Sequence, residues 1–413
     1  MDVTLQPRPI SGSISAIASK SQAHRLLICA ALSNCPTNIV CAELSQDIEA
    51  SARCLTALGA ELHYADSAFT VHPIELPQGE NVLDVGESGS TLRFLLPVAA
   101  ALGVRATFRL HGRLPERPLS PLWEELEAHG CRLSRPTPDT LLCEGRLHGG
   151  QYYLPGNISS QFISGLLFAL PLTGEASEIH LTSSAESLSY IHMTLAALRS
   201  FGVAVKETAD GWQIPAEQHF SSIGSAFVEG DWSNAAFWLC AGAISKSVSC
   251  TGLSPDSPQG DRKILECLRN FGAQITWENG TVTVSPASLH GIEIDARDIP
   301  DLVPPLALVA ATAEGTTRIF GAERLRIKES DRLQSVADTL NSLGGHVEVM
   351  PDGLLIRGGH LRGGTIQSQN DHRIAMLGAI AASVCTESVT ICGSEAVNKS
   401  YPRFWADLRQ MQR

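Results

Sequence analysis

The chain of 413 residues lacks the apolar run and the leader that a membrane or exported protein needs. No stretch of about 18 residues is apolar without polar interruption, so no segment is expected to span a membrane. The N-terminus has neither the charged and apolar regions of a signal peptide nor an Arg- and Ser-rich transit segment. We therefore expect a soluble cytoplasmic protein with no membrane partner.

Three kinds of binding site also lack support. The 11 cysteines are scattered without CxxC pairs or metal-ligand spacing, which predicts buried free thiols in a reducing compartment and no metal site. Neither a GxGxxG segment nor a Walker A loop is present, so nothing indicates nucleotide binding. The net charge of −12 argues against general nucleic-acid binding, which needs a basic surface.

What the chain does contain is a long internal repeat. Apolar helical runs that open on a polar residue recur at intervals of about 70 residues. They begin near Lys20, Ser90, Ser160, Asp231, Asp301 and Asp371. A second series of helical runs ends in glycine at the same interval and precedes strand-like segments. These glycines are Gly59, Gly130, Gly202, Gly272 and Gly344, and a sixth helix of this series would be 404–411. The two series predict six copies of one unit with two helices and several strands.

The repeat also predicts the domain organisation. Length and an apolar content of 44% allow two or three domains with large cores. Helices of the first series are apolar on nearly every face, which indicates central helices buried on all sides. We place the return crossing at 227–232, because six similar units most simply divide three and three. The expected domains are 19–228 and the discontinuous pair 1–18 plus 229–413, with the active-site cleft between them.

Polar residues at the helix starts are candidate anion ligands. Lys20 and Ser21 open the first helix, and Arg25 lies one turn further along on the same face as Ser21. A helix N-terminus with an added ammonium and guanidinium is a ready anion site. Gly89, in the Gly- and Ser-rich segment 86–93, would let backbone approach a ligand closely, although a plain helix cap is an equal alternative.

Two further segments of the first half add hydrogen-bonding groups. Arg113 and Arg117 lie between prolines in 111–120, which would position a guanidinium unless the segment is simply a solvated loop. Neutral side chains that suit a polyol or a phosphate ester open the third helix, at Ser159, Ser160 and Gln161. The polar segment 183–190 continues this lining.

The last three repeats carry the charged candidates. Asp301 opens the fifth helix of the first series, where it is either an N-cap or a general base that faces an anion. The densest charged cluster is 324–333, in which Lys328 and Glu329 are each about one helical turn from Arg332. Its alternative is a solvated helix face. Two further cations stand near helix starts, Arg373 and Lys399.

These motifs resemble those of the 5-enolpyruvylshikimate-3-phosphate synthase family over essentially the whole chain. The matching segments are SKSQAHR (19–25), GESGSTLR (86–93), ERP (116–118), SSQF (159–162), EGD (229–231), IPD (299–301), RIKESDR (326–332), NDHR (370–373) and NKSYP (398–402). The resemblance implies an α/β (α+β) fold of two similar globular domains, each with three βαβαββ repeats around buried parallel helices, an inverse α/β barrel. That architecture agrees with the sixfold repeat.

The resemblance also implies an activity. A member of this family is a transferase that moves the enolpyruvyl group of phosphoenolpyruvate to the 5-hydroxyl of shikimate 3-phosphate, through a tetrahedral ketal, and releases phosphate. The family works in the shikimate pathway to chorismate and the aromatic amino acids and is the target of glyphosate. We expect a monomer that needs no metal or organic cofactor, with these two small anions as its partners.

Site residues follow by motif. Shikimate 3-phosphate is expected to contact Lys20, Ser21, Arg25, Ser159, Ser160, Gln161, Ser187, Tyr190, Asp301 and Lys328. Phosphoenolpyruvate is expected to contact Lys20, Gly89, Arg117, Gln161, Arg332, Arg373 and Lys399. The catalytic candidates are Asp301 as proton acceptor, Glu329 as a carboxylate in proton transfer to the methylene carbon, and Lys20. Glu87 and Arg324 depart from the family pattern, which often has Asn at both positions, and Glu87 adds a negative charge beside an anion site.

Three alternative functions fit the sequence less well. The sister transferase that acts on UDP-N-acetylglucosamine usually carries a cysteine in a mobile loop near the first-domain arginines, and 111–120 has none; the nearest thiol is Cys131. RNA 3′-phosphate cyclases have related units but depend on a nucleotide. A non-catalytic anion-binding protein would lack at least one of four groups, Lys20, Asp301, Glu329 and Lys399, and all four are present. Catalysis on shikimate 3-phosphate is therefore favoured.

Overall fold

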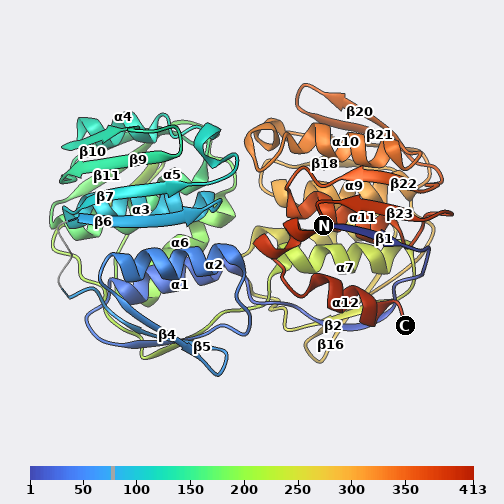
Figure 1. Cartoon of the computed structure of the whole chain (residues 1–413), viewed down its shortest axis with the longest axis horizontal. Coiled ribbons are helices and arrows are strands. Elements are labelled where there is room, and N and C mark those ends of the chain that lie inside the picture. The colour runs from blue at the N-terminus through green and yellow to red at the C-terminus, as the bar shows by residue number, and fades with distance from the viewer. Residues whose placement is uncertain (76–79) are drawn as a thin grey trace. The chain divides into compact units, whose positions relative to one another are not determined.

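The computed structural model of the chain describes residues 1–75 and 80–413. The chain forms two compact units, Met1–Ile17 with Glu229–Arg413 and Ala18–Val228. We call the first the discontinuous unit and the second the continuous unit. The chain starts in the discontinuous unit, passes through the whole continuous unit and then returns (Figure 1).

The continuous unit is built from three copies of one repeat. Each described copy has an apolar helix, a second helix and a four-stranded sheet with one parallel and two antiparallel pairs. The apolar helices are α1 (Lys20–Ala31), α3 (Gly89–Leu102) and α5 (Ser160–Ala169), and the second helices are α2 (Gln46–Ala57), α4 (Leu122–Ala128) and α6 (Leu188–Ser200).

The three sheets of this unit have the strand orders β14-β3-β5-β4, β6-β7-β9-β8 and β10-β11-β13-β12. Their strands are β3 (Thr37–Val40), β4 (Glu61–Ala65), β5 (Ala68–His72), β6 (Glu80–Gly86), β7 (Arg105–Leu110), β8 (Cys131–Ser134), β9 (Thr140–Gly145), β10 (Gln151–Pro155), β11 (Ser177–Ser183), β12 (Lys206–Glu207), β13 (Gly211–Ile214) and β14 (Ser225–Phe227). Because β14 pairs with β3, the first sheet is completed by the last segment of the unit.

The discontinuous unit repeats the plan, except that its third sheet has three strands in the described part of the chain. Its apolar helices are α7 (Trp232–Ile244), α9 (Val303–Thr312) and α11 (His372–Ala381), and its second helices are α8 (Ile264–Phe271), α10 (Arg332–Ser342) and α12 (Phe404–Met411). The sheets have the orders β16-β17-β15-β2, β18-β19-β21-β20 and β1-β23-β22. The N-terminal strands β1 (Asp2–Leu5) and β2 (Gly12–Ser15) each complete a sheet formed by the C-terminal half.

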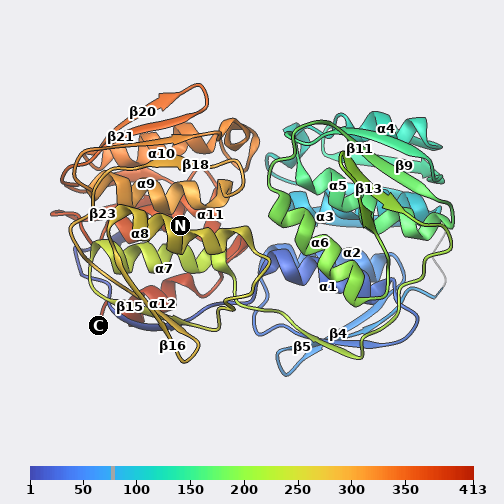
Figure 2. The ribbon, with the colours of Figure 1, turned by 180° about the vertical axis from the view of Figure 1, so that it is seen from behind.

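The remaining strands of this unit are β15 (Val248–Thr251), β16 (Gln274–Glu278), β17 (Thr281–Ser285), β18 (Glu293–Asp295), β19 (Thr316–Phe320), β20 (His346–Met350), β21 (Gly353–Arg357), β22 (Gly364–Gln367) and β23 (Val389–Cys392). Short 3₁₀ helices interrupt the loops of both units, at η1 (Leu114–Glu116), η2 (Leu170–Thr173), η3 (Gly260–Lys263), η4 (Pro300–Leu302), η5 (Glu323–Ile327) and η6 (Ser394–Lys399). Figure 2 shows each unit from behind, with α8 on that face of the discontinuous unit and α6 on that face of the continuous unit.

The glycine at the end of each of the first five second helices confirms the repeat expected from the sequence. All five adopt a positive φ, from 80° at Gly202 to 109° at Gly272. A left-handed residue at this position lets backbone amides bond the last carbonyls of the helix, and only glycine adopts it without a steric penalty.

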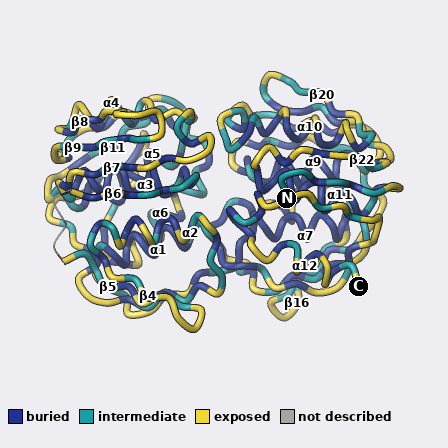
Figure 3. The backbone as a smooth tube through the Cα atoms, in the orientation of Figure 1, coloured by how far each residue is buried: buried dark blue, intermediate teal, exposed yellow. Residues whose placement is uncertain are grey.

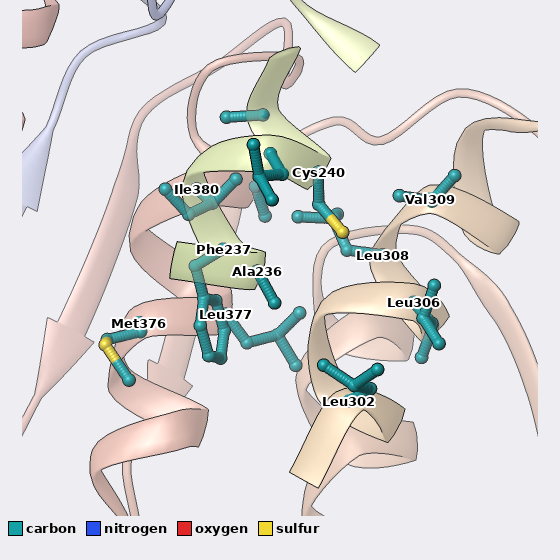
Figure 4. Packing of buried hydrophobic residues seen from close by; sticks show 14 of the residues in the cluster. Ala236, Phe237, Cys240, Leu302, Leu306, Leu308, Val309, Met376, Leu377 and Ile380 are labelled. Atoms are coloured by element: carbon teal, nitrogen blue, oxygen red, sulfur yellow. The ribbon is translucent and has the colours of Figure 1, made fainter. Parts of the chain in front are cut away.

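The apolar helices form the core of each unit, as their sequence predicts. Every residue of α7 from Trp232 to Ala243 is buried, and Figure 3 shows the central helices as buried throughout their middle turns. In the discontinuous unit, α7, α9 and α11 contact one another, and Phe237, Leu306 and Leu377 are among the side chains between them (Figure 4). A helix that is apolar all round is stable only when it is buried on all sides.

The structure excludes one of the two alternatives for Asp301 and the helical spacing expected for Lys328 and Glu329. Asp301 is not an N-cap: it lies in η4, α9 begins at Val303, and the residue before it, Leu302, makes no side-chain capping bond. Lys328 and Glu329 do not lie on a helix face, because α10 begins only at Arg332 and the residues before it form a bend. Both changes place charged side chains in loops at helix N-termini rather than along helices.

The remaining whole-chain expectations concern cysteines and membrane spans. Among the described residues all 11 cysteines are free thiols; nine are buried, whereas Cys35 is exposed and Cys392 is half-buried. None of the helices in 1–75 and 80–413 combines the length and apolar character needed to cross a bilayer.

Candidate active site

The start of α1 presents a lysine that is already paired with a carboxylate. Ser19 caps the helix by accepting from the Gln22 amide. The ammonium of Lys20 donates to Asp47 on α2 across 2.7 Å, and both side chains are 16% exposed. An anion that binds here must therefore compete with Asp47 for the lysine.

Arg25 lies deeper and is held by the protein itself. Its Nε donates to Thr194 Oγ1 at 2.8 Å, its Nη1 to the Ser21 carbonyl at 2.6 Å, and its Nη2 to the Tyr190 carbonyl at 2.8 Å. The guanidinium also lies over the ring of Phe94, 5.1 Å from its centroid. Burial lowers its pKa to about 10. Arg25 therefore fixes the backbone at two of the expected ligand positions, Ser21 and Tyr190.

Two guanidinium groups converge on the start of α3. A Cβ placed on Gly89 would stand 2.7 Å from Nη1 of both Arg93 and Arg117. Arg93 also donates to Gln161 Oε1 at 3.0 Å and to the Pro118 carbonyl at 3.1 Å. Two like charges this close repel each other, so an anion between them would be stabilised. Glycine at position 89 leaves the space for this arrangement, whereas a larger residue would require the ends of both arginine side chains to move.

The neutral candidates of the continuous unit all lie where a helix begins. Ser159 caps α5 by accepting from the Gln161 amide at 3.3 Å, and Ser160 is the first residue of that helix. Gln161 donates through Nε2 to Ser90 Oγ at 2.9 Å, which connects α5 to α3. Ser187, just before α6, has a φ of 55°, a left-handed conformation that is costly for serine and concentrates at functional sites.

In the discontinuous unit, Arg332 is the centre of a carboxylate cluster. Its side chain is 2% exposed. Its Nε donates to Asp371 at 2.9 Å, its Nη1 to Asp301 at 2.9 Å, and its Nη2 to Glu329 at 2.7 Å. Burial opposes its charge, but the three carboxylates outweigh burial and raise the pKa of Arg332 above its usual range.

Asp301 lies between two guanidinium groups. Its Oδ1 accepts from Arg332, and its Oδ2 is 3.0 Å from Nη2 of Arg373, which also donates to Ser233 Oγ. Burial favours the neutral acid, but the charges of Arg373, Lys328 and Arg332 outweigh it and hold the pKa of Asp301 well below its usual range. The carboxylate is therefore ionised wherever these cations are charged.

Lys328 belongs to the same cluster and lies close enough to Asp301 for their charges to interact. Burial lowers its pKa to about 8, because the loss of hydration outweighs the attraction of Asp301.

Lys399, in η6, donates to the Asn370 carbonyl at 2.6 Å, beside the N-terminus of α11. Lys399 therefore binds the residue directly before Asp371, and Asp371 both caps α11 and binds Arg332.

The expected site residues therefore fall into two clusters, one in each unit. The cluster of the continuous unit contains Lys20, Ser21, Arg25, Gly89, Arg117, Ser159, Ser160, Gln161, Ser187 and Tyr190. The cluster of the discontinuous unit contains Asp301, Lys328, Glu329, Arg332, Arg373 and Lys399. Of the two departures from the family pattern, Arg324 donates to the Arg297 carbonyl at 2.7 Å, and Glu87 lies beside Gly112.

Three contacting residues were not identified from the sequence: Asp47, Arg93 and Asp371. Arg93 and Asp371 lie inside two of the matching motifs, GESGSTLR and NDHR, and this position is a usable signal for both. Asp47 follows a serine that caps α2 and gives no such signal. Its role depends on the packing of α1 against α2, which no local pattern reveals.

Comparison with solved structures defines the class of protein. The enolpyruvyl transferase NikO from Streptomyces tendae superposes with a TM-score of 0.77 at 19% identity, over 99% of this chain and 97% of that one. An EPSP synthase from Acinetobacter baumannii superposes with a TM-score of 0.82 at 26% identity, again over 99% and 97%. The fold is that of the enolpyruvyl transferases.

Sequence comparison gives the family. A family model described as EPSP synthase (3-phosphoshikimate 1-carboxyvinyltransferase) matches residues 5–408. Proteins of that name from Clostridium acetobutylicum and Clostridium kluyveri are 43% and 40% identical, each over 99% of this chain and 97% of the relative. The chain belongs to the EPSP synthase family. Its activity is the transferase reaction of the shikimate pathway, on shikimate 3-phosphate and phosphoenolpyruvate, which confirms the resemblance seen in the motifs.

Proposed function

We propose that the two clusters act on the same pair of substrates and divide the work between them. The groups near α1, α5 and α6 bind shikimate 3-phosphate, together with Asp301 and Lys328. The guanidinium groups at Gly89, with Gln161, Arg332, Arg373, Lys20 and Lys399, bind phosphoenolpyruvate. Both substrates are anions, and bringing them together costs Coulomb energy that such cations offset. Arginine suits carboxylate and phosphate because it can bind two oxygens at once.

Asp301 is proposed as the group that takes the proton of the 5-hydroxyl. Its neighbouring cations make it a weak base, since they hold its pKa low. Two bound anions would offset the charge of these cations. The cations would then stabilise the Asp301 carboxylate less, and the pKa of Asp301 would rise. Binding of the substrates therefore strengthens the base.

The reaction needs a second group that donates a proton to the methylene carbon of phosphoenolpyruvate. Addition consumes one proton at carbon and releases one at the hydroxyl. Elimination then takes a proton back from the methyl carbon and breaks the bond to phosphate, which leaves with a proton. At least two positioned acid–base groups are therefore required. Glu329 and Lys20 are proposed for the second role; Glu329 is 2.7 Å from Arg332 and Lys20 is 2.7 Å from Asp47.

The observation that carries this assignment is the ionised Asp301 between two buried guanidinium groups. The experiment that tests it is phosphate release from phosphoenolpyruvate with shikimate 3-phosphate or UDP-N-acetylglucosamine as acceptor. We expect release with shikimate 3-phosphate alone, and strong loss of that release when Asp301 is replaced. Release with the sugar nucleotide alone would contradict the motif assignments.

We also propose that the protein is a cytoplasmic monomer. Free thiols are typical of a reducing compartment, and nine of the described cysteines are buried as such. Each unit completes its own sheets, with β1, β2 and β14 supplied by this chain itself. Light scattering after gel filtration tests the monomer, and a dimer at micromolar concentration would contradict it.

A further inference from the structure

A buried chain of hydrogen bonds joins α1, α2 and α3 inside the continuous unit. It starts at His24 on α1, whose side chain is almost fully buried, and its Nδ1 is 2.7 Å from Ser51 Oγ on α2. Ser51 Oγ is 2.8 Å from Thr91 Oγ1 on α3, which donates to Ser88 Oγ at 2.8 Å. No role proposed above uses any of these four side chains.

The direction of every bond in this chain can be worked out from its last member. Thr91 donates its only hydroxyl proton to Ser88, so Ser51 must donate to Thr91. Ser51 then has no proton left, so His24 must donate to it from Nδ1. Burial lowers the pKa of His24 to about 3, which makes the ring neutral, with its single proton on Nδ1.

The other end of the chain leaves one proton unused. Ser88 Oγ accepts from both the amide and the hydroxyl of Thr91, which occupies its two lone pairs. Its own proton must then point in the one remaining direction, and within 1–75 and 80–413 it donates to no residue. Ser88 is 2% exposed and is the N-cap of α3, directly before Gly89, where the guanidinium groups converge.

We propose that His24 is a positioning residue for phosphoenolpyruvate binding. Through Ser51 and Thr91 it keeps the Ser88 hydroxyl oriented so that its proton is donated to an oxygen of the anion at the start of α3. The same chain ties this helix to α1, which carries Lys20 one turn before His24. The proposal rests on the assignment of phosphoenolpyruvate to Gly89 and Arg117, and it adds Ser88 as a donor there.

The test compares variants that break the chain with variants that retain it. We expect Ser88→Ala to raise KM for phosphoenolpyruvate about 10- to 100-fold, the effect of one hydrogen bond to a charged group, with KM for shikimate 3-phosphate unchanged. His24→Leu should raise the same KM by a smaller factor, because the hydroxyl remains but is no longer oriented. His24→Asn, whose amide can donate to Ser51, should restore most of it.

A double variant separates positioning from packing. If the chain acts as a unit, adding His24→Leu to Ser88→Ala should raise KM no further, since the group being oriented is already gone. If the double variant instead raises KM by the product of the two single-variant factors, the proposal is overturned. Should His24→Leu fail to fold, Ser51→Ala breaks the same chain and carries the same expectation.

Two controls decide what a change in KM means. Ser45 caps α2 as Ser88 caps α3, so Ser45→Ala loses a similar cap without touching the anion, and its KM should stay normal. An equal rise in Ser45→Ala would overturn the role of Ser88. Arg117→Ala tests the anion site itself. If this variant binds phosphoenolpyruvate normally, the anion position is refuted. If it binds phosphoenolpyruvate weakly while His24→Leu keeps a normal KM, only the role of His24 is refuted.

Discussion

Replacing Asp301 with asparagine is the most direct perturbation of the proposed chemistry. The change keeps size and shape but removes both the negative charge and the proton acceptor. At this position it also leaves a hydrogen-bond donor facing another donor. In the parent protein both carboxylate oxygens of Asp301 face guanidinium nitrogens, at 2.9 Å from Arg332 and 3.0 Å from Arg373. An asparagine oxygen can accept from one of them, but its amide must then face the other, donor against donor.

The expected loss can be worked from these contacts. A positioned general base contributes about 10²- to 10⁴-fold to rate, equivalent to about 3 to 5 kcal/mol in the barrier. We therefore expect kcat of Asp301→Asn to fall at least about 100-fold. Affinity for phosphoenolpyruvate should change little or increase, because one negative charge has left a cluster that binds an anion.

Phosphate release at saturating concentrations of both substrates gives kcat, and titration of each substrate in turn gives the two KM values. Asp295→Asn is a matched control, since Asp295 forms an exposed pair with Arg297 in the same unit and has no proposed role. Thermal denaturation shows whether each variant is folded. A folded Asp301→Asn with kcat within threefold of the parent would refute the assignment of Asp301 as the base.

Three further changes test other parts of the structure. Gly89→Ala places a methyl group where Nη1 of Arg93 and of Arg117 would be only 2.7 Å away, so KM for phosphoenolpyruvate should rise at least about tenfold, the effect of losing one charged contact, while KM for shikimate 3-phosphate stays normal. Because the pKa of Lys328 is about 8, its ammonium is lost as pH rises through that value; KM for shikimate 3-phosphate should increase there, and Lys328→Arg, which stays charged, should abolish the increase in a pH titration. Phe237→Ala removes a fully buried ring between the central helices and should lower the free energy of unfolding by about 3 to 5 kcal/mol in a denaturant titration, with the remaining protein active.

The fold could be predicted from the sequence because the repeat produces two independent sequence patterns. The apolar helices are visible as runs without a polar face, and the second helices as runs that end in glycine. Gly59 and Gly344 are at equivalent positions in different units, and both are left-handed. Each pattern is a local requirement of the backbone or the core, so neither depends on knowing the partners of any residue.

The site was predicted less completely, because its geometry depends on contacts between distant segments. Lys20 and Asp47 are on different helices, and Arg25 reaches Thr194 far along the chain. Spacing along the sequence even misled at Lys328, where a helical turn was expected and a bend is found before α10. Motifs identify which residues matter, whereas their pairing follows from how the helices pack.

The pairings change the picture of how anions bind. A row of cations alone would be unstable, since like charges within a few ångströms repel each other strongly where little water separates them. In the discontinuous unit this repulsion is offset by the carboxylates of Asp301, Glu329 and Asp371 around Arg332. A substrate anion that contacts these guanidinium groups offsets part of their positive charge, which the carboxylates otherwise offset alone. The same event weakens the field that holds the pKa of Asp301 low, so binding strengthens the base that the reaction needs. Substrate binding and base strength are therefore coupled through shared cations, and this coupling would be lost if Asp301 stood away from them.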